Sequence, residues 1–136
     1  MIGDVAIAVA RVLIALLYIL MAYRQIRFWP HVQKEMAAHG MRHTELFLPL
    51  AVAVEILGGL SLGLGYAAAW GAWLLIAYTL VATAIFYRRL SDRDEFIHCL
   101  KNLAIVGGLL MIAATDPAAA RVNAAAVAPA GQTTAK

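Results

Sequence analysis

The feature that most constrains this chain is a set of four apolar stretches, each near the ~20 residues that a helix needs to cross ~30 Å of hydrocarbon. They cover residues 5–23, 46–66, 67–87 and 96–114. Backbone N–H and C=O groups in lipid must be hydrogen-bonded within their own element, which favours helices over strands. The sequence therefore predicts an all-α integral membrane protein, a four-helix bundle forming one transmembrane domain over residues 1–115.

Composition excludes a soluble fold. Of the 136 residues, 63% are hydrophobic and 14% are charged, whereas soluble domains have about 45–50% apolar and about 25% charged residues. The third stretch has no charged residue between Gly65 and Arg88, although a soluble helix normally keeps one polar face. The lipid bilayer is therefore the expected surrounding of the chain.

Basic residues predict how the chain lies in the membrane. They cluster in two of the connections, as Arg24, Arg27, Lys34 and Arg42 in the first and Arg88, Arg89, Arg93 and Lys101 around the third. The positive-inside rule then places the first and third connections in the cytoplasm. Lipid headgroups are the natural counter-ions of such clusters, which argues against a nucleic-acid partner despite the net charge of +3.

The segments outside the spans have patterns of their own. In the first connection, Pro30 suits the first turn of a helix and Gly40 suits its end, with apolar residues between them. We expect a short interfacial helix there, between spans one and two. Residues 116–136 are rich in alanine and proline without a period, which predicts a disordered tail.

Charged residues inside a membrane span need an explanation, because each costs about 2.5 to 3.5 kcal/mol even on lenient insertion scales. Counting ~1.5 Å per residue from the first connection places Arg11 about 18 Å deep and Glu55 about 13 Å deep, with Lys101 entering from the same side. These three side chains could form a buried ionic cluster. One interpretation is a packing clamp between helices; the other is a polar site for a quinone headgroup, a small polar ligand or a proton relay.

Other polar residues in the spans also allow two interpretations, and two glycine pairs predict helix packing. Thr79 and Thr83 lie one turn apart, and with Asn102 they could complete a ligand pocket or simply hydrogen-bond to neighbouring helices. The glycine pairs Gly58-Gly59 and Gly107-Gly108 predict close approach of helix backbones.

Four residues at steps of four resemble metal-ligand spacing: His31, Glu35, His39 and His43. Gly40 interrupts the helix before His43, and such a stripe is more often the wet face of an interfacial helix, so we predict no metal site. The single cysteine, Cys99, excludes dithiol exchange within the chain.

Several motifs occur in a characteristic order between residue 11 and about residue 114. They are Arg11, His39-Gly40, Glu55 with Gly58-Gly59, Ala82-Thr83 with Phe86, and Lys101-Asn102-Leu103-Ala104 with Gly107-Gly108. In these motifs the chain resembles the DoxX family of small four-helix membrane proteins. The resemblance implies a protein of the bacterial inner membrane, and a quinone-linked or redox-associated subunit similar to those of thiosulfate:quinone oxidoreductases. It does not identify a substrate or a reaction.

Three functions follow as hypotheses. The favoured one is a membrane subunit of an oxidoreductase system that exchanges electrons with quinone and receives them from a soluble or membrane redox partner. The second is a small-molecule transporter or channel-like protein, which at this length requires a homo-oligomer. The third is a non-catalytic membrane scaffold that recruits soluble redox enzymes through its first and third connections.

Overall fold

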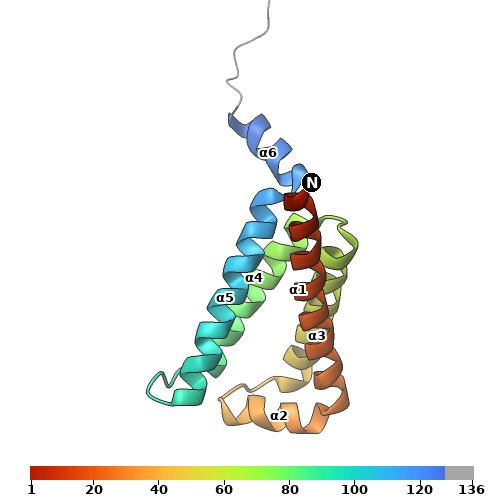
Figure 1. The fold of residues 1–136 in the computed structure, drawn as a ribbon. Helices are drawn as coiled ribbons and strands as arrows, with labels where there is room; N and C mark the ends of the chain where they lie inside the picture. Colours follow the sequence, from red (N-terminus) through yellow and green to blue (C-terminus); the bar gives the residue numbers. More distant parts are fainter. Residues whose placement is uncertain (128–136) are drawn as a thin grey trace, which may run out of the picture.

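The computed structural model describes residues 1–127 as six helices, and no strand occurs among those residues (Figure 1). The helices are α1 (Ile2–Arg27), α2 (Trp29–Ala38), α3 (Thr44–Leu64), α4 (Ala68–Phe86), α5 (Arg93–Thr115) and α6 (Pro117–Val127). Four of them, α1, α3, α4 and α5, are long and apolar enough to cross a membrane. This confirms the predicted all-α membrane bundle of four helices.

The connections follow from local backbone chemistry. Pro30 lies in the first turn of α2, where its missing N–H removes no helical bond. Gly40, just past the end of α2, and Gly65, at the end of α3, both have positive φ, at 86° and 72°, which glycine adopts without steric cost. Ala67 also has a positive φ of 50° at the start of α4, so the α3–α4 hairpin turns within a few residues.

The long helices pack as two pairs, α1 on α3 and α4 on α5, which are joined through the contact of α3 with α4. The pairs lie close together at one end of the bundle, the turn end, where residues 65–67 connect α3 to α4 (Figure 1). They diverge toward the opposite end, the α2 end, which α2 closes from below. A buried apolar cluster around Leu62, Leu75 and Leu109 joins the pairs, and a smaller one around Met36 and Leu48 holds α2.

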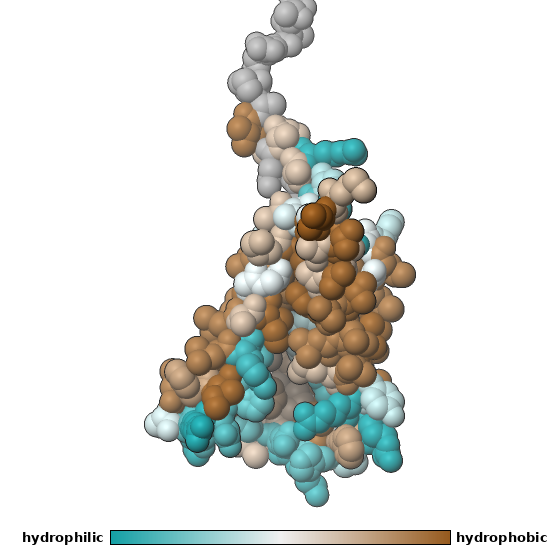
Figure 2. Space-filling view, viewed as in Figure 1, coloured by the Kyte–Doolittle hydropathy of each residue, from teal (hydrophilic) through white to brown (hydrophobic). Residues whose placement is uncertain are grey.

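The outer surface of the bundle is apolar. Large side chains such as Leu57, Val81 and Met111 are 59–69% exposed. Soluble monomers rarely expose apolar surface of this extent to water. Figure 2 shows this hydrophobic surface over α1 and α5, with hydrophilic residues gathered at the α2 end. Lipid is the solvent that such a surface requires.

The end of the chain differs from the expected disordered tail in one segment. The structure forms α6 over Pro117–Val127, where alanine, the strongest helix former, is abundant and proline stands at the first position. The rest of the expected tail, residues 128–136, lies outside the described residues.

The predicted close packing occurs at Gly58 but not at Gly107, and one experiment can test this difference. A Cβ on Gly58 would lie 2.6 Å from Cγ of Leu75 in α4, whereas a Cβ on Gly107 meets nothing within 4 Å. We expect Gly58→Ala to lower the free energy of unfolding in detergent by about 1–3 kcal/mol through overpacking. Gly107→Ala, the matched control, should be neutral or stabilising by about 0.5–1 kcal/mol. Equal effects of the two substitutions would contradict the α3–α4 contact.

Candidate functional site

Glu55 is the most unusual residue of the bundle, because its side chain is fully buried in the middle of a membrane span. It lies on the inward face of α3, which also carries Leu48, Val52, Gly58 and Leu62 at helical spacing. The sequence therefore directs a carboxylate into the protein rather than into lipid.

Two side chains from neighbouring helices hold the Glu55 carboxylate. Nε2 of Gln25, on α1, donates to both carboxylate oxygens at 2.9 and 2.8 Å. The hydroxyl of Tyr78, on α4, donates to Oε1 at 2.7 Å. Among the described residues, no cation lies within ion-pair distance of Glu55, so the carboxyl group is stabilised by neutral hydrogen-bond donors alone.

A second set of hydrogen bonds continues from α4 to α1 and α5. The hydroxyls of Tyr18 and Thr79 lie 2.5 Å apart, and Thr79 follows Tyr78 directly in α4. Thr83 donates to the Thr79 carbonyl at 2.6 Å and accepts from Nδ2 of Asn102 at 2.9 Å. We call the seven residues together the polar cluster: Tyr18, Gln25, Glu55, Tyr78, Thr79, Thr83 and Asn102.

The polar cluster is nearly saturated with internal bonds. Every fully buried side-chain nitrogen and oxygen among the described residues has a partner. Free capacity remains on the two amides: Asn102 has a second Nδ2 hydrogen and a carbonyl oxygen that accepts nothing within the described chain, and Oε1 of Gln25 accepts nothing there either. Both residues are partly exposed. They belong to α5 and α1, the helices on either side of the hollow that Figure 2 shows above α2.

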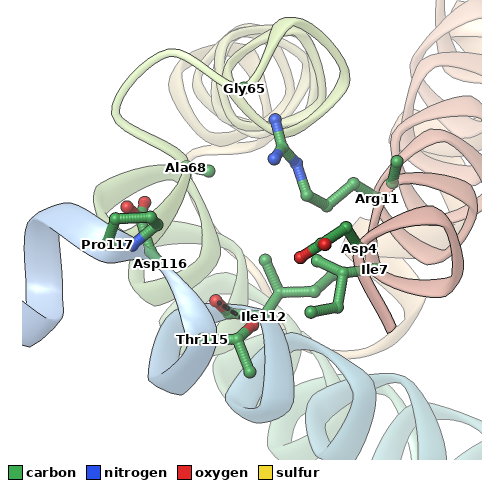
Figure 3. Close-up of a pocket in the computed structure, with 10 residues that line it drawn as sticks. Asp4, Ile7, Arg11, Gly65, Ala68, Ile112, Thr115, Asp116 and Pro117 are labelled. Carbon is green, nitrogen blue, oxygen red and sulfur yellow. Dashed lines mark hydrogen bonds between the residues drawn. The ribbon is translucent and has the colours of Figure 1, made fainter. Parts of the chain in front are cut away.

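Arg11 and Lys101, expected beside Glu55, lie elsewhere. Nε of Arg11 donates to the Leu62 carbonyl at 3.1 Å, about two turns of α3 beyond Glu55. Figure 3 shows its guanidinium turned toward Gly65 at the turn end. Helical side chains lean toward the N-terminus of their helix, which in α1 is the direction away from Glu55. Lys101 is exposed on α5. The expected ionic cluster of these three residues is therefore not formed.

Sequence reasoning did not select Tyr18, Gln25 or Tyr78, which complete the cluster. Gln25 falls beyond the apolar stretch that ended at residue 23, because α1 continues to Arg27. Tyr18 and Gln25 are seven residues apart and so share one helix face. That spacing is the signal that could have identified them.

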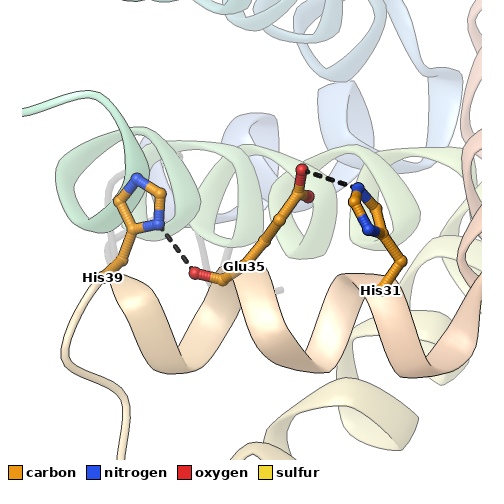
Figure 4. Close-up of polar contacts among 3 residues, drawn as sticks. All are labelled: His31, Glu35 and His39. Carbon is orange, nitrogen blue, oxygen red and sulfur yellow. Dashed lines mark hydrogen bonds and ion pairs between the residues drawn. The ribbon is translucent and has the colours of Figure 1, made fainter.

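Three of the residues with metal-like spacing, His31, Glu35 and His39, do not converge on one point (Figure 4). Nε2 of His31 lies 3.3 Å from Oε1 of Glu35, while Nδ1 of His39 bonds the backbone oxygen of Glu35 at 2.8 Å. The His39 ring also packs against Phe86, with ring centroids 5.1 Å apart. In residues 1–127, no group of three or more histidine, cysteine or acidic side chains could hold a metal ion.

Comparisons with known proteins agree with this architecture. The family model DoxX matches residues 6–88. The inner membrane protein YqjF of Escherichia coli (strain K12) is 30% identical to this chain over 120 residues, which cover 88% of this chain and 91% of that protein. No solved structure matches the chain.

Proposed function

This chain belongs to the DoxX family, and from that premise we propose that it is a quinone-linked membrane subunit whose polar cluster binds a quinone headgroup. It is a multi-pass protein with four membrane-spanning helices, and its similarity to an inner membrane protein supports an inner-membrane location. The redox role rests on the family resemblance and on the chemistry of the polar cluster.

The observation that carries the proposal is the burial of Glu55 without a counter-ion. An ionisable side chain inside a membrane bundle is expensive and generally marks a pathway or a ligand site. A pure packing contact between α1, α3 and α4 could be made by apolar residues at lower cost. A carboxyl group at this position, held by two neutral donors, Gln25 and Tyr78, therefore favours a functional role.

The free hydrogen-bonding groups fit a quinone. Its ring carbonyls accept hydrogen bonds, which the second Nδ2 hydrogen of Asn102 can donate. The hydroxyls of its reduced form donate hydrogen bonds, which Oε1 of Gln25 can accept. Asn102 belongs to α5 and Gln25 to α1, the helices on either side of the hollow in Figure 2, and the surrounding apolar surface suits an isoprenoid tail.

Four residues of the polar cluster then have defined tasks. A quinone, when bound, supplies the electron-carrying chemistry together with its protons. Asn102 and Gln25 orient the headgroup, while the Glu55 carboxylate, which accepts the hydrogen bond from Tyr78, is the proton acceptor inside the bundle. The apolar clusters on either side exclude water from that position. Electrons reach the site from a redox partner of the subunit.

We expect Glu55→Gln to fold but to lose bound quinone. The substitution places an amide against the Nε2 donor of Gln25 and removes the proton-accepting carboxylate. Quinone in the organic extract of detergent-purified protein should fall at least fivefold per mole of chain relative to wild type. Leu57→Ala, at a position on α3 that is 64% exposed, is the matched control and should retain wild-type quinone.

A second variant distinguishes a loss of quinone binding from misfolding of the Glu55 variant. Asn102→Ala removes a free donor without touching the hydrogen bonds of Glu55, and it should also reduce the quinone content. Wild-type quinone levels in both Glu55→Gln and Asn102→Ala would contradict the proposal, as would wild-type protein that carries no quinone above that of the surrounding lipid.

We also propose that the α2 end faces the cytoplasm, since the first and third connections carry most of the basic residues. In a Cys99→Ser background, Ser91→Cys marks the α4–α5 connection and Tyr66→Cys marks the α3–α4 turn. A membrane-impermeant thiol reagent applied to intact spheroplasts should label Tyr66→Cys and not Ser91→Cys. The reverse labelling pattern would overturn this orientation.

A further inference from the structure

A cavity of about 330 Å³ opens at the turn end of the bundle, separate from the polar cluster. Its wall comes from the first turns of α1, the α3–α4 turn, and the end of α5 where it meets α6. Figure 3 shows Arg11, Asp4 and Asp116 around this space, with the guanidinium of Arg11 reaching across it toward Gly65.

Arg11 is only partly engaged by the protein. Nε donates to the Leu62 carbonyl, which also satisfies an end carbonyl of α3. Among the described residues, the two terminal Nη groups make no hydrogen bond and no ion pair. A guanidinium with both Nη groups free presents a planar fork that matches phosphate or carboxylate oxygens.

The backbone around Arg11 leaves room for this fork. Gly65 stands beneath the guanidinium, and a Cβ at that position would collide with Nη2 of Arg11. The same glycine has the positive φ that the turn requires. Gly65 therefore serves two purposes, because it allows the chain to turn and allows Arg11 to extend into the cavity.

The acidic residues restrict what kind of anion the cavity accepts. Oδ2 of the exposed Asp4 pairs with the ammonium of Met1 at 3.4 Å, and the second carboxylate oxygen can accept the ammonium group of a ligand. Asp116 accepts the Ala69 N–H at 2.7 Å. The Met1 ammonium and Arg11 balance the two carboxylates, so the cavity has no net positive charge to attract a ligand that carries only negative charge. A zwitterion, with its anionic group on Arg11 and its ammonium near Asp4, satisfies both signs.

The level of the cavity in the membrane indicates the source of such a zwitterion. Gly65 is followed by Tyr66 and Trp70, which are 83% and 79% exposed at the turn end. Exposed tyrosine and tryptophan mark the membrane–water interface, where lipid headgroups lie. The cavity therefore opens where phosphate and ammonium groups of lipids are abundant.

We propose that the Arg11 cavity binds the headgroup of a zwitterionic phospholipid that carries a primary ammonium, with its phosphate on Arg11 and its ammonium on Asp4. This site does not depend on quinone binding at the polar cluster. It accounts for a charged residue within the first span by giving it a ligand at the headgroup level.

Native mass spectrometry of the full chain released from detergent tests the proposal. The probes are dihexanoyl phosphatidylethanolamine, dihexanoyl phosphatidylglycerol and free O-phosphoethanolamine. Wild-type protein should bind the ethanolamine lipid at least tenfold more tightly than the glycerol lipid. Arg11→Gln should weaken binding of the ethanolamine lipid about tenfold or more, and Arg11→Lys should weaken it less, because lysine keeps the charge without the fork.

Asp4→Asn should not affect folding, since Asp4 is exposed and its ion pair is with Met1 rather than with another helix. It should reduce the preference for the ethanolamine lipid over the glycerol lipid severalfold. Arg24→Gln, an exposed arginine at the α2 end, is the matched charge control and should bind as wild type does.

Three outcomes would overturn the proposal. The first is equal binding of the two lipids by wild type, and the second is an equal loss in Arg11→Gln and Arg24→Gln. The third is equally tight binding of free O-phosphoethanolamine, which would assign the cavity to a soluble zwitterion rather than to lipid.

Discussion

The hydrogen bonds that Gln25 and Tyr78 donate to Glu55 are the interaction on which the inner half of this bundle depends. A carboxyl group surrounded by hydrocarbon cannot turn to water, so its partners must come from the helices packed around it. Here they come from α1 and α4, while Glu55 itself belongs to α3. One buried side chain thus fixes the rotation of three helices about their axes, and it does so without a second charge.

The two ends of the molecule have different chemistry because the two intramembrane charges are kept apart. Glu55 lies in the polar cluster, which also includes Thr79, Thr83 and Asn102. Arg11 reaches the turn end, where its Nε bond to Leu62 leaves the rest of the guanidinium in a separate cavity. The two proposals therefore give the bundle one site for a redox ligand and another for a lipid headgroup, each built around one charge.

The fold could be predicted from the sequence because the thickness of the hydrocarbon sets the length of each span, and the apolar stretches match that length. Glu55, Thr79, Thr83 and Asn102 were also visible as polar residues within spans. The separation of Arg11 from Glu55 was not predictable, since counting residues gives the depth of a residue but neither the face of the helix on which it lies nor the direction in which its side chain leans. Gln25 was missed because α1 extends past its apolar stretch to Arg27.

The central claim is that Glu55 is coupled to Gln25 and not to Arg11, and double-mutant cycles on unfolding free energy in bicelles test it most directly. Glu55→Gln combined with Gln25→Leu should show a coupling energy of about 1 kcal/mol or more, as expected for residues in one hydrogen-bond network. Glu55→Gln combined with Arg11→Gln should be additive within about 0.5 kcal/mol. Additivity in the first cycle together with strong coupling in the second would contradict this account.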